Sequence, residues 1–268
     1  MQRPYIGITG FMSRYEVDHI LGSADPYHGH KVMVGVLASQ KTVRGEKNKW
    51  PNRYPEMKDL PYIFSDHHQA LNLIHFNTKT PDTLAEQLME VVRLAAPAEI
   101  YKVSKLHGFQ LNLAWPDPNE IRRFMTAFEA ITGMVYNLKI VLQIGGHAFT
   151  MVDNDQKKLA DKVASYKELV QYVLLDPSGG YGKPFDTAAA DAYLAELSSR
   201  DLDMGLGVAG GLSAETLDLV TPLAIKYPNL SIDAEGRLRD KDDNLDLKNA
   251  LRYVLEAQRL FKNATKLA

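Results

Sequence analysis

Short apolar runs rich in branched side chains alternate with longer amphipathic stretches along this 268-residue chain. Runs of this length predict strands buried on both faces, and the spacing of apolar residues in the longer stretches predicts helices. The eight predicted strands are Tyr5–Thr9, Val32–Leu37, Leu71–Phe76, Phe109–Leu113, Lys139–Ile144, Tyr172–Asp176, Asp203–Ala209 and Leu230–Ala234. Strands that alternate with helices are typical of βα units around a parallel sheet. Eight units without a linker predict an α/β fold in which residues 1–268 form a single domain, a closed TIM-type (β/α)₈ barrel.

A few residues mark where the predicted helices begin. Pro81 suits the first turn of a helix that runs to residue 95, and Ser213 predicts the N-cap of another helix that covers residues 214–227. The last predicted helix covers residues 245–261, and its apolar stripe contains Leu247, Leu251 and Leu255. We expect this stripe to pack on the barrel and to close the ring.

The connection from Ser39 to Gln69 is too long and too polar for a simple link between a strand and a helix. Segments of this kind either close over a functional site or form flexible surface insertions, and the sequence leaves both interpretations open. The predicted barrel therefore carries a long loop after its second strand.

Polar residues recur where the predicted strands end, at positions that point into the barrel. Alternate residues of a strand face inward, and in register the inward set is Thr9, His75 or Asn77, Asn112, Gln143, Asp176 and Asp233. Barrel enzymes assemble their active sites at this end, whereas polar groups deep in the barrel are costly to bury unless they are paired. The pattern therefore predicts an active site at the carboxyl ends of the strands.

The composition narrows the kinds of partner. Hydrophobic residues make up 45% of the chain and charged residues 24%, so a large core can form, and a net charge of -2 gives no basic field for nucleic acid or anionic lipid. The N-terminus lacks the order of a signal peptide, and no apolar run approaches about 18 residues. We expect a cytoplasmic protein with a small-molecule substrate, no nucleic-acid or membrane partner and no cofactor; a homodimer is compatible with the sequence. The absence of cysteine excludes disulfides, thiolate metal sites and thiol nucleophiles.

Two glycine-rich turns follow predicted strands. The strand that ends at Asp176 leads into Gly179, Gly180 and Gly182, and Gly210 and Gly211 follow the next strand along the chain. Glycine lets backbone amides approach a ligand closely, and a helix that begins after such a turn presents free N–H groups to an anion.

In this order, the segments resemble phosphoribosylanthranilate isomerase, a barrel enzyme that performs an Amadori rearrangement on a phosphorylated aminosugar. The family's LLD strand end, GGTG-like turn and AGGL segment read here Leu174-Leu175-Asp176, Gly179-Gly180-Tyr181-Gly182 and Ala209-Gly210-Gly211-Leu212. Gly7-Ile8-Thr9-Gly10 is similar to the family's KICG, and Gln110-Leu111-Asn112 to its QLH. The resemblance implies that Asp176 is the general acid that protonates the ribose ring oxygen, that the residue at Thr9 is the general base, and that the glycines hold phosphate.

Two positions depart from that family. Thr9 stands where the family has cysteine, and a threonine hydroxyl is far too weak an acid to ionise near neutral pH without a strong partner. His147, in the GGHAF segment after the fifth strand, is the best substitute base. On the eighth strand Asp233 and Glu235 place two carboxylates beside the expected phosphate, which they would repel. The cations that could compensate are Lys41, Arg44, Lys183, Arg237 and Arg239.

The sequence thus predicts an isomerase of this type that acts by acid–base chemistry on a small, phosphorylated, sugar-derived metabolite. The predicted catalytic residues are Asp176, Thr9 and His147, and the predicted substrate- or phosphate-binding residues are Gly180, Gly182, Gly210, Gly211, Arg44, Asn112, Asp233 and Glu235. Two alternatives stay open. One is a metal-assisted aldolase, epimerase or hydrolase that uses Asp176 and Asp233, which His75 could join; the other is a catalytically silent barrel that binds a metabolite.

Overall fold

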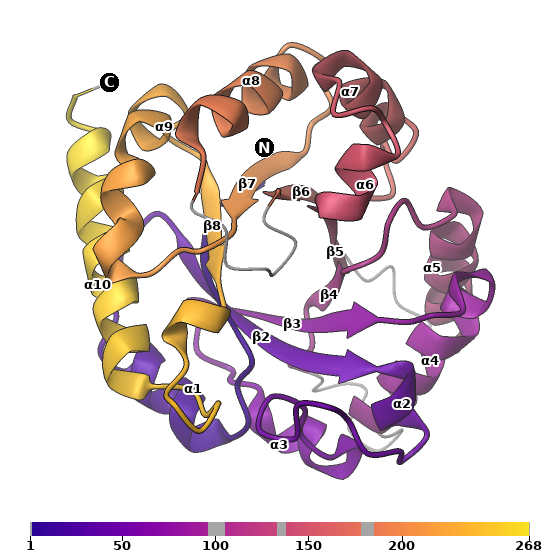
Figure 1. The fold of residues 1–268 in the computed structure, drawn as a ribbon. Helices are drawn as coiled ribbons and strands as arrows, with labels where there is room; N and C mark the ends of the chain where they lie inside the picture. The colour runs from indigo at the N-terminus through magenta and orange to yellow at the C-terminus, as the bar shows by residue number, and fades with distance from the viewer. Residues whose placement is uncertain (1, 96–104, 133–137, 178–184, 268) are drawn as a thin grey trace.

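The computed structural model describes residues 2–95, 105–132, 138–177 and 185–267. Its eight parallel strands follow one another around a closed barrel, and β1 pairs with both β2 and β8. The strands are β1 (Tyr5–Thr9), β2 (Lys31–Ser39), β3 (Ala70–Asn77), β4 (Gly108–Leu111), β5 (Lys139–Gly145), β6 (Tyr172–Asp176), β7 (Gly205–Ala209) and β8 (Ser231–Ala234). Helices form a ring outside them (Figure 1). The predicted TIM barrel is confirmed, and every predicted strand begins and ends within two residues of the observed one.

Helices separate the strands, and several of them begin at polar caps. The α-helices are α1 (Arg14–Leu21), α2 (Gln40–Val43), α3 (Leu60–Ile63), α4 (Leu84–Ala95), α5 (Pro118–Thr132), α6 (Gly146–Thr150), α7 (Gln156–Ala164), α8 (Thr187–Ser198), α9 (Thr221–Lys226) and α10 (Leu247–Ala264). Asp155, Asp186 and Asp246 each accept the backbone N–H three residues ahead, at the starts of α7, α8 and α10. Such caps satisfy N–H groups that have no partner inside the helix.

The segment after β7 differs from the single predicted helix. It forms a 3₁₀ helix, Ala214–Leu219, followed by the short α9. Pro222 lies in the first turn of α9, where a backbone N–H is not needed for a helical hydrogen bond. A continuous helix through this position would need that N–H, so Pro222 separates the two helices. Ser213 precedes the 3₁₀ helix as predicted, and its N–H donates to Thr216 Oγ1 at 2.9 Å.

The face of α10 that packs on the barrel also differs from the predicted stripe. Ala250, Tyr253, Val254, Ala257 and Phe261 are buried, whereas Leu255 is 41% exposed. The two alanines let the helix backbone approach the barrel closely, so the leucines lie on its flank. Figure 1 shows α10 beside α9 and α1 at the edge of the molecule.

Below the strand ends, the barrel interior is filled by apolar side chains, namely Tyr5, Met33, Leu71, Leu73, Val141, Tyr172, Leu174 and Ala209. The rings of Tyr5 and Tyr172 meet edge to face with centroids 5.3 Å apart. Gly7 makes room above them, because a Cβ there would lie 2.7 Å from Asp233 Oδ1 and 2.8 Å from Met33 Cε. The floor of the barrel is therefore closed, and polar groups begin one layer above it.

The long segment after β2 is partly folded onto the barrel. It contains α2, a 3₁₀ turn at Met57–Asp59 and α3, and it buries Met57, Leu60, Ile63 and Phe64. Residues 44–56 and 64–69 within it lack regular structure. In the described ranges of the chain, no helix combines the length and the apolar character needed to cross a membrane.

Candidate active site

A cavity of about 540 Å³ opens at the carboxyl ends of the strands, and we call it the mouth cavity. Its floor carries His75, Gln143, Asp176 and Asp233, all of which lie on strands. Its rim consists of Arg53 from the long segment and of residues 209–212 and 234–237, which end or follow β7 and β8. Between the two strand positions left open by the sequence, the structure places His75 inside, whereas Asn77 is exposed.

A chain of hydrogen bonds joins the two carboxylates on the floor. Thr9 Oγ1 lies 3.3 Å from Asp233 Oδ1, and Gln110 Nε2 donates to Asp233 Oδ2 at 3.0 Å. Gln110 Nε2 also donates to Gln143 Oε1 at 3.2 Å, and Gln143 Nε2 donates to Asp176 Oδ2 at 3.0 Å. All five side chains are at most 7% exposed. The chain holds both carboxylates in fixed orientations, which is what proton transfer to a bound molecule requires.

Asp233 is the most perturbed carboxyl group of the site. Burial raises its pKa to about 7, the charges of Glu235 and Asp176 act in the same direction, and the hydrogen bonds from Gln110 and Thr9 oppose the shift. A carboxyl group with a pKa near 7 can both take up and release a proton at neutral pH. Thr9, in turn, can donate its hydroxyl hydrogen to this carboxylate, so it has the strong partner that the sequence did not reveal.

His75, on the floor of the same cavity, favours its neutral form. Burial lowers its pKa, although the charges of Glu235 and Asp176 oppose the shift. Its Nδ1 faces Gln110 Nε2 at 3.3 Å. The Nε2 atom of His75 is buried without a hydrogen-bond partner among the described residues.

Glu235 does not face the cavity as an isolated charge. Arg53 Nη1 donates to Glu235 Oε1 at 2.8 Å, and Arg53 Nη2 donates to Asp243 Oδ1 at 2.6 Å. The guanidinium lies 4.9 Å from the ring centre of Trp50. Of the two carboxylates expected to repel phosphate, Glu235 is therefore partly compensated by Arg53, whose single positive charge it shares with Asp243, and Asp233 is partly protonated at neutral pH.

The turn after β7 lines the mouth cavity with backbone groups. Gly210 and Gly211 have φ values of +109° and +64°, conformations that residues with a Cβ rarely adopt. Neither amide donates a hydrogen bond to another described residue. Arg237, whose side chain is exposed, lines the same cavity. Amides and a cation around one hollow can hold an anionic group.

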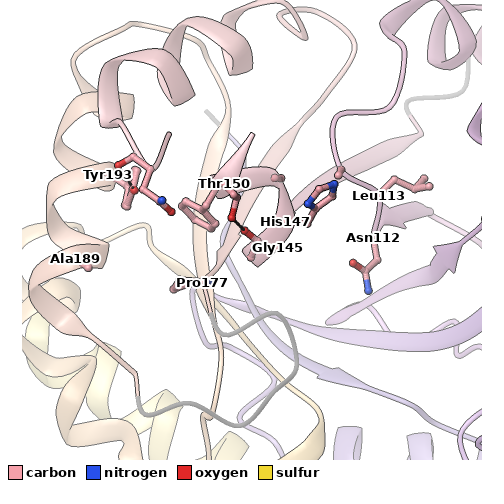
Figure 2. Close-up of a pocket in the computed structure, with 13 residues that line it drawn as sticks. Asn112, Leu113, Gly145, His147, Thr150, Pro177, Ala189 and Tyr193 are labelled. Carbon is pink, nitrogen blue, oxygen red and sulfur yellow. Dashed lines mark hydrogen bonds between the residues drawn. The ribbon is translucent and has the colours of Figure 1, made fainter. Parts of the chain in front are cut away.

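Asn112 and His147 lie together in a second cavity, of about 620 Å³, next to the first; we call it the side cavity. Figure 2 shows Asn112 and His147 on one side of it and Tyr193 of α8 on the other. Pro177 and Gly145 line it too, and they follow the strand ends that carry Asp176 and Gln143. The side cavity is thus adjacent to the carboxylates, but His147 lines this cavity and not the one that contains them.

The structure places the remaining predicted residues as follows. Lys41 and Arg44 are exposed and line neither cavity, Gly180, Gly182 and Lys183 fall outside the described residues, and Arg239 donates to the carbonyl oxygen of Gly10 at 2.9 Å. Two site residues, Gln110 and Arg53, were not predicted. Gln110 lies one inward position before Asn112 on its strand, so the same alternation could have found it. Arg53 gave no signal, because its partners lie 182 and 190 positions away along the chain.

Comparison with known proteins gives structural likenesses at low sequence identity. The phosphoribosylanthranilate isomerase of Thermus thermophilus has a TM-score of 0.59 and 17% identity over 95% of this chain and 98% of that chain. The likeness shows the fold. A Thermotoga maritima phosphoribosylanthranilate isomerase has a TM-score of 0.54 and 15% identity over 95% of this chain and 98% of that chain, and a chitinase domain of Pyrococcus furiosus has a TM-score of 0.54 and 12% identity over 98% and 97%. No protein-family profile and no curated protein matches the sequence.

Within the described residues, no three His, Asp or Glu side chains are arranged to hold a metal ion. What the mouth cavity does present is a pair of oriented carboxylates, a neutral imidazole and a rim with amides and arginines. This arrangement can move protons on a small polar molecule and hold an anionic part of it.

Proposed function

We propose that this protein is a barrel enzyme that isomerises a small, sugar-derived metabolite by proton transfer, with Asp233 as general base and Asp176 as general acid. The observation that carries the proposal is Asp233, a buried carboxyl group with a pKa of about 7 that is hydrogen-bonded to Thr9 and Gln110. It lines the same cavity as Asp176. Two carboxyl groups in different environments are a common way to separate base and acid roles.

Asp233 takes the base role that the resemblance to phosphoribosylanthranilate isomerase gave to the residue at Thr9. In its ionised form, Asp233 removes a proton from the carbon next to an imine or carbonyl carbon. Thr9 keeps this carboxylate oriented through its hydroxyl. The electron pair of the broken C–H bond forms a carbon–carbon double bond, while the π pair of the imine or carbonyl moves onto its nitrogen or oxygen, which takes up a proton. The resulting enol then loses its hydroxyl proton and takes up a proton at the former imine or carbonyl carbon, which completes the isomerisation.

Asp176 takes the acid role, which is the role the resemblance implies for it. It protonates the ring oxygen, so that the carbon–oxygen bond opens and the carbon chain becomes free to rearrange. Gln143 holds its Oδ2 at 3.0 Å. The side cavity next to Asp176 has room for the part of the substrate that does not react.

The groups at the rim of the mouth cavity favour a substrate that carries a phosphate or a carboxylate. The amides of Gly210 and Gly211 and the guanidinium of Arg237 border the cavity. Since Arg53 pairs with Glu235 as well as with Asp243, repulsion from the β8 end is smaller than the sequence alone indicates.

The decisive experiment measures turnover on a panel of aldose phosphates and N-substituted glycosylamine phosphates. Asp176→Asn and Asp233→Asn should each lower kcat by about 10² or more, the scale for loss of a positioned acid or base. Asp191→Asn is the matched control, because Asp191 pairs with Lys226 on the outside of the barrel. Wild-type protein without turnover on any substrate would favour a binding protein. Loss of a tightly bound metal ion in both variants, measured by elemental analysis, would favour the metal-assisted alternative.

A second experiment tests the anion site without a substrate. Inorganic phosphate should raise the melting temperature of the wild type, because a ligand that binds only the folded state stabilises it. Arg237→Met should need at least a threefold higher phosphate concentration to reach the same rise in melting temperature. Arg44→Met, which removes an exposed arginine that lines neither cavity, should leave it unchanged. Equal effects of the two variants would reject the site.

A further inference from the structure

Arg53 connects the long segment after β2 to the end of β8 at the edge of the mouth cavity. Arg53 forms ion pairs with Glu235 and Asp243. The preceding residue, Asn52, donates through Nδ2 to the carbonyl oxygen of Asp242 at 2.9 Å. Arg239 Nη1 donates back to the carbonyl oxygen of Asn52 at 3.2 Å. Residues 44–56 have no regular structure of their own, so these contacts hold them against the loop after β8.

The carboxylate of Glu235, which pairs with Arg53, lies next to the proposed base. Glu235 follows Asp233 by two positions at the end of β8, and both line the mouth cavity. Two carboxylates on one rim repel each other when both are ionised, and an opposite charge on one of them relieves this repulsion. The contact that docks the segment is therefore also a contact that acts on Asp233 through Glu235.

We propose that Arg53 is a positioning residue for Asp233: by pairing with Glu235 it docks residues 44–56 at the mouth cavity and, in the same contact, relieves the repulsion that Glu235 exerts on ionised Asp233. Asp233 therefore ionises most readily when residues 44–56 are docked. When the segment leaves, Glu235 loses its partner and Asp233 holds its proton more tightly. This inference rests on Asp233 as the proposed base, but its test needs no substrate.

Other groups around Asp233 do not account for the same effect. The titratable and charged groups that act on or lie beside it are Tyr5 from β1, His75 from β3 through Gln110, Asp176 from β6, Tyr253 from α10, Glu235 directly after β8, and Arg239, which donates to the carbonyl oxygen of Thr9 at 3.4 Å. Of these, Glu235 is the one that carries an ion pair with the long segment. Arg53 thus reaches Asp233 by way of Glu235.

The test is the titration of Asp233, followed by carbon NMR of ¹³C-labelled aspartate carboxyl groups in the full-length protein and assigned with Asp233→Asn. The wild type should titrate with a midpoint near the raised pKa of about 7. Arg53→Gln should move the midpoint up by about one pH unit, a roughly tenfold gain in proton affinity, and Glu235→Gln should move it down. In the Glu235→Gln background, adding Arg53→Gln should have no further effect, because the group through which Arg53 acts is gone.

Arg44→Gln is the matched control, since Arg44 is an exposed arginine in the same segment, and its midpoint should equal that of the wild type. Arg53→Lys keeps one positive charge and should recover part of the shift. An unchanged midpoint in folded Arg53→Gln overturns the proposal. So does an equal upward shift with and without Glu235, because Arg53 would then act on Asp233 directly. If turnover is never found but these shifts are, the proposed reaction fails while the coupling stands.

Discussion

The stability of the fold depends on whether the buried carboxyl group of Asp233 is protonated. Its folded-state pKa of about 7 lies above the ordinary value of 3.8, so the folded protein binds this proton more tightly than the unfolded chain does. The stability contributed by the protonated group is complete below the unfolded pKa and is lost as the pH rises through 7.

Replacing Asp233 by Asn should therefore stabilise the protein at alkaline pH, although it should lower the turnover of the proposed isomerisation. We expect a gain of about 2–4 kcal/mol in the free energy of unfolding at pH 8 and less than about 1 kcal/mol at pH 4. Urea unfolding at the two pH values measures the difference. A gain that is the same at both pH values would mean that ionisation of Asp233 does not cause it.

His30 has the opposite dependence on pH. It lies under α10, its ring stacks on Phe261 with centroids 3.9 Å apart, and Nε2 lies 3.0 Å from the carbonyl oxygen of Leu230. Burial lowers its pKa to about 4, and the nearby charges of His28 and Arg3 act in the same direction. Because the folded-state pKa is below the unfolded value of 6.5, stability is complete above pH 6.5 and falls between pH 6.5 and 4.

His30→Gln keeps a donor for Leu230 but removes the titration. The wild type should lose about 3 kcal/mol more than this variant between pH 7 and pH 4. Urea unfolding across this range provides the comparison. Parallel stability curves for the two proteins would assign the acid sensitivity to other groups.

At this scale, strand alternation was a good guide to the site. Thr9, Gln143, Asp176 and Asp233 were predicted to face inward because side chains of a strand alternate with a period of two, and all four do. The roles of these residues were harder to predict than their directions. The raised pKa of Asp233 depends on burial and on neighbours from three other strands, which no local pattern encodes.

Among the elements, the long segment after β2 combines two kinds of structure. Its second half folds into α3 with buried apolar residues, whereas residues 44–56 depend on the contacts of Arg53 and its neighbours. Periodicity could not separate the two, because short helical turns of three or four residues carry too few positions to show a period. The helix after β7 was predicted as one piece for a related reason: Pro222 fits a first helical turn but also ends what precedes it.

The dependence of residues 44–56 on Arg53 can be measured through Trp50. This ring is 43% exposed and lies against the guanidinium of Arg53. In a Trp115→Phe background Trp50 is the one remaining tryptophan, and Arg53→Gln should raise its acrylamide quenching constant about twofold as the segment leaves the β8 loop. Quenching that stays at the wild-type level would show that other contacts hold the segment.

For the molecule as a whole, closure of the barrel depends on its last helix. α10 packs against α1, α9 and β1, next to the place where the first and last strands meet. Its buried side chains Tyr253, Val254 and Phe261 each contribute about 2–3 kcal/mol, so together they approach the total stability of a typical protein.

A chain that ends at Asp246 should therefore lose its cooperative thermal transition, followed by near-UV circular dichroism. A chain that ends at Ala264, after the last turn of α10, is the control and should melt within about 4 °C of the wild type, since Leu267 is 72% exposed. Cooperative melting of the shorter chain would show that the strands close without α10.

The tyrosine pair that closes the barrel floor also limits where a hydrogen taken from the substrate can exchange with water. Tyr5 and Tyr172 fill the interior below Asp233, so a hydrogen that Asp233 takes from a substrate cannot leave by the lower end of the barrel. While the product occupies the mouth, that hydrogen has few water molecules with which to exchange. For the proposed isomerisation, we use a substrate that is deuterated at the carbon that loses its hydrogen. In ordinary water, part of this deuterium should appear in the product. Mass spectrometry of the product measures the fraction of deuterium retained, which reports how slowly the hydrogen on Asp233 exchanges with water.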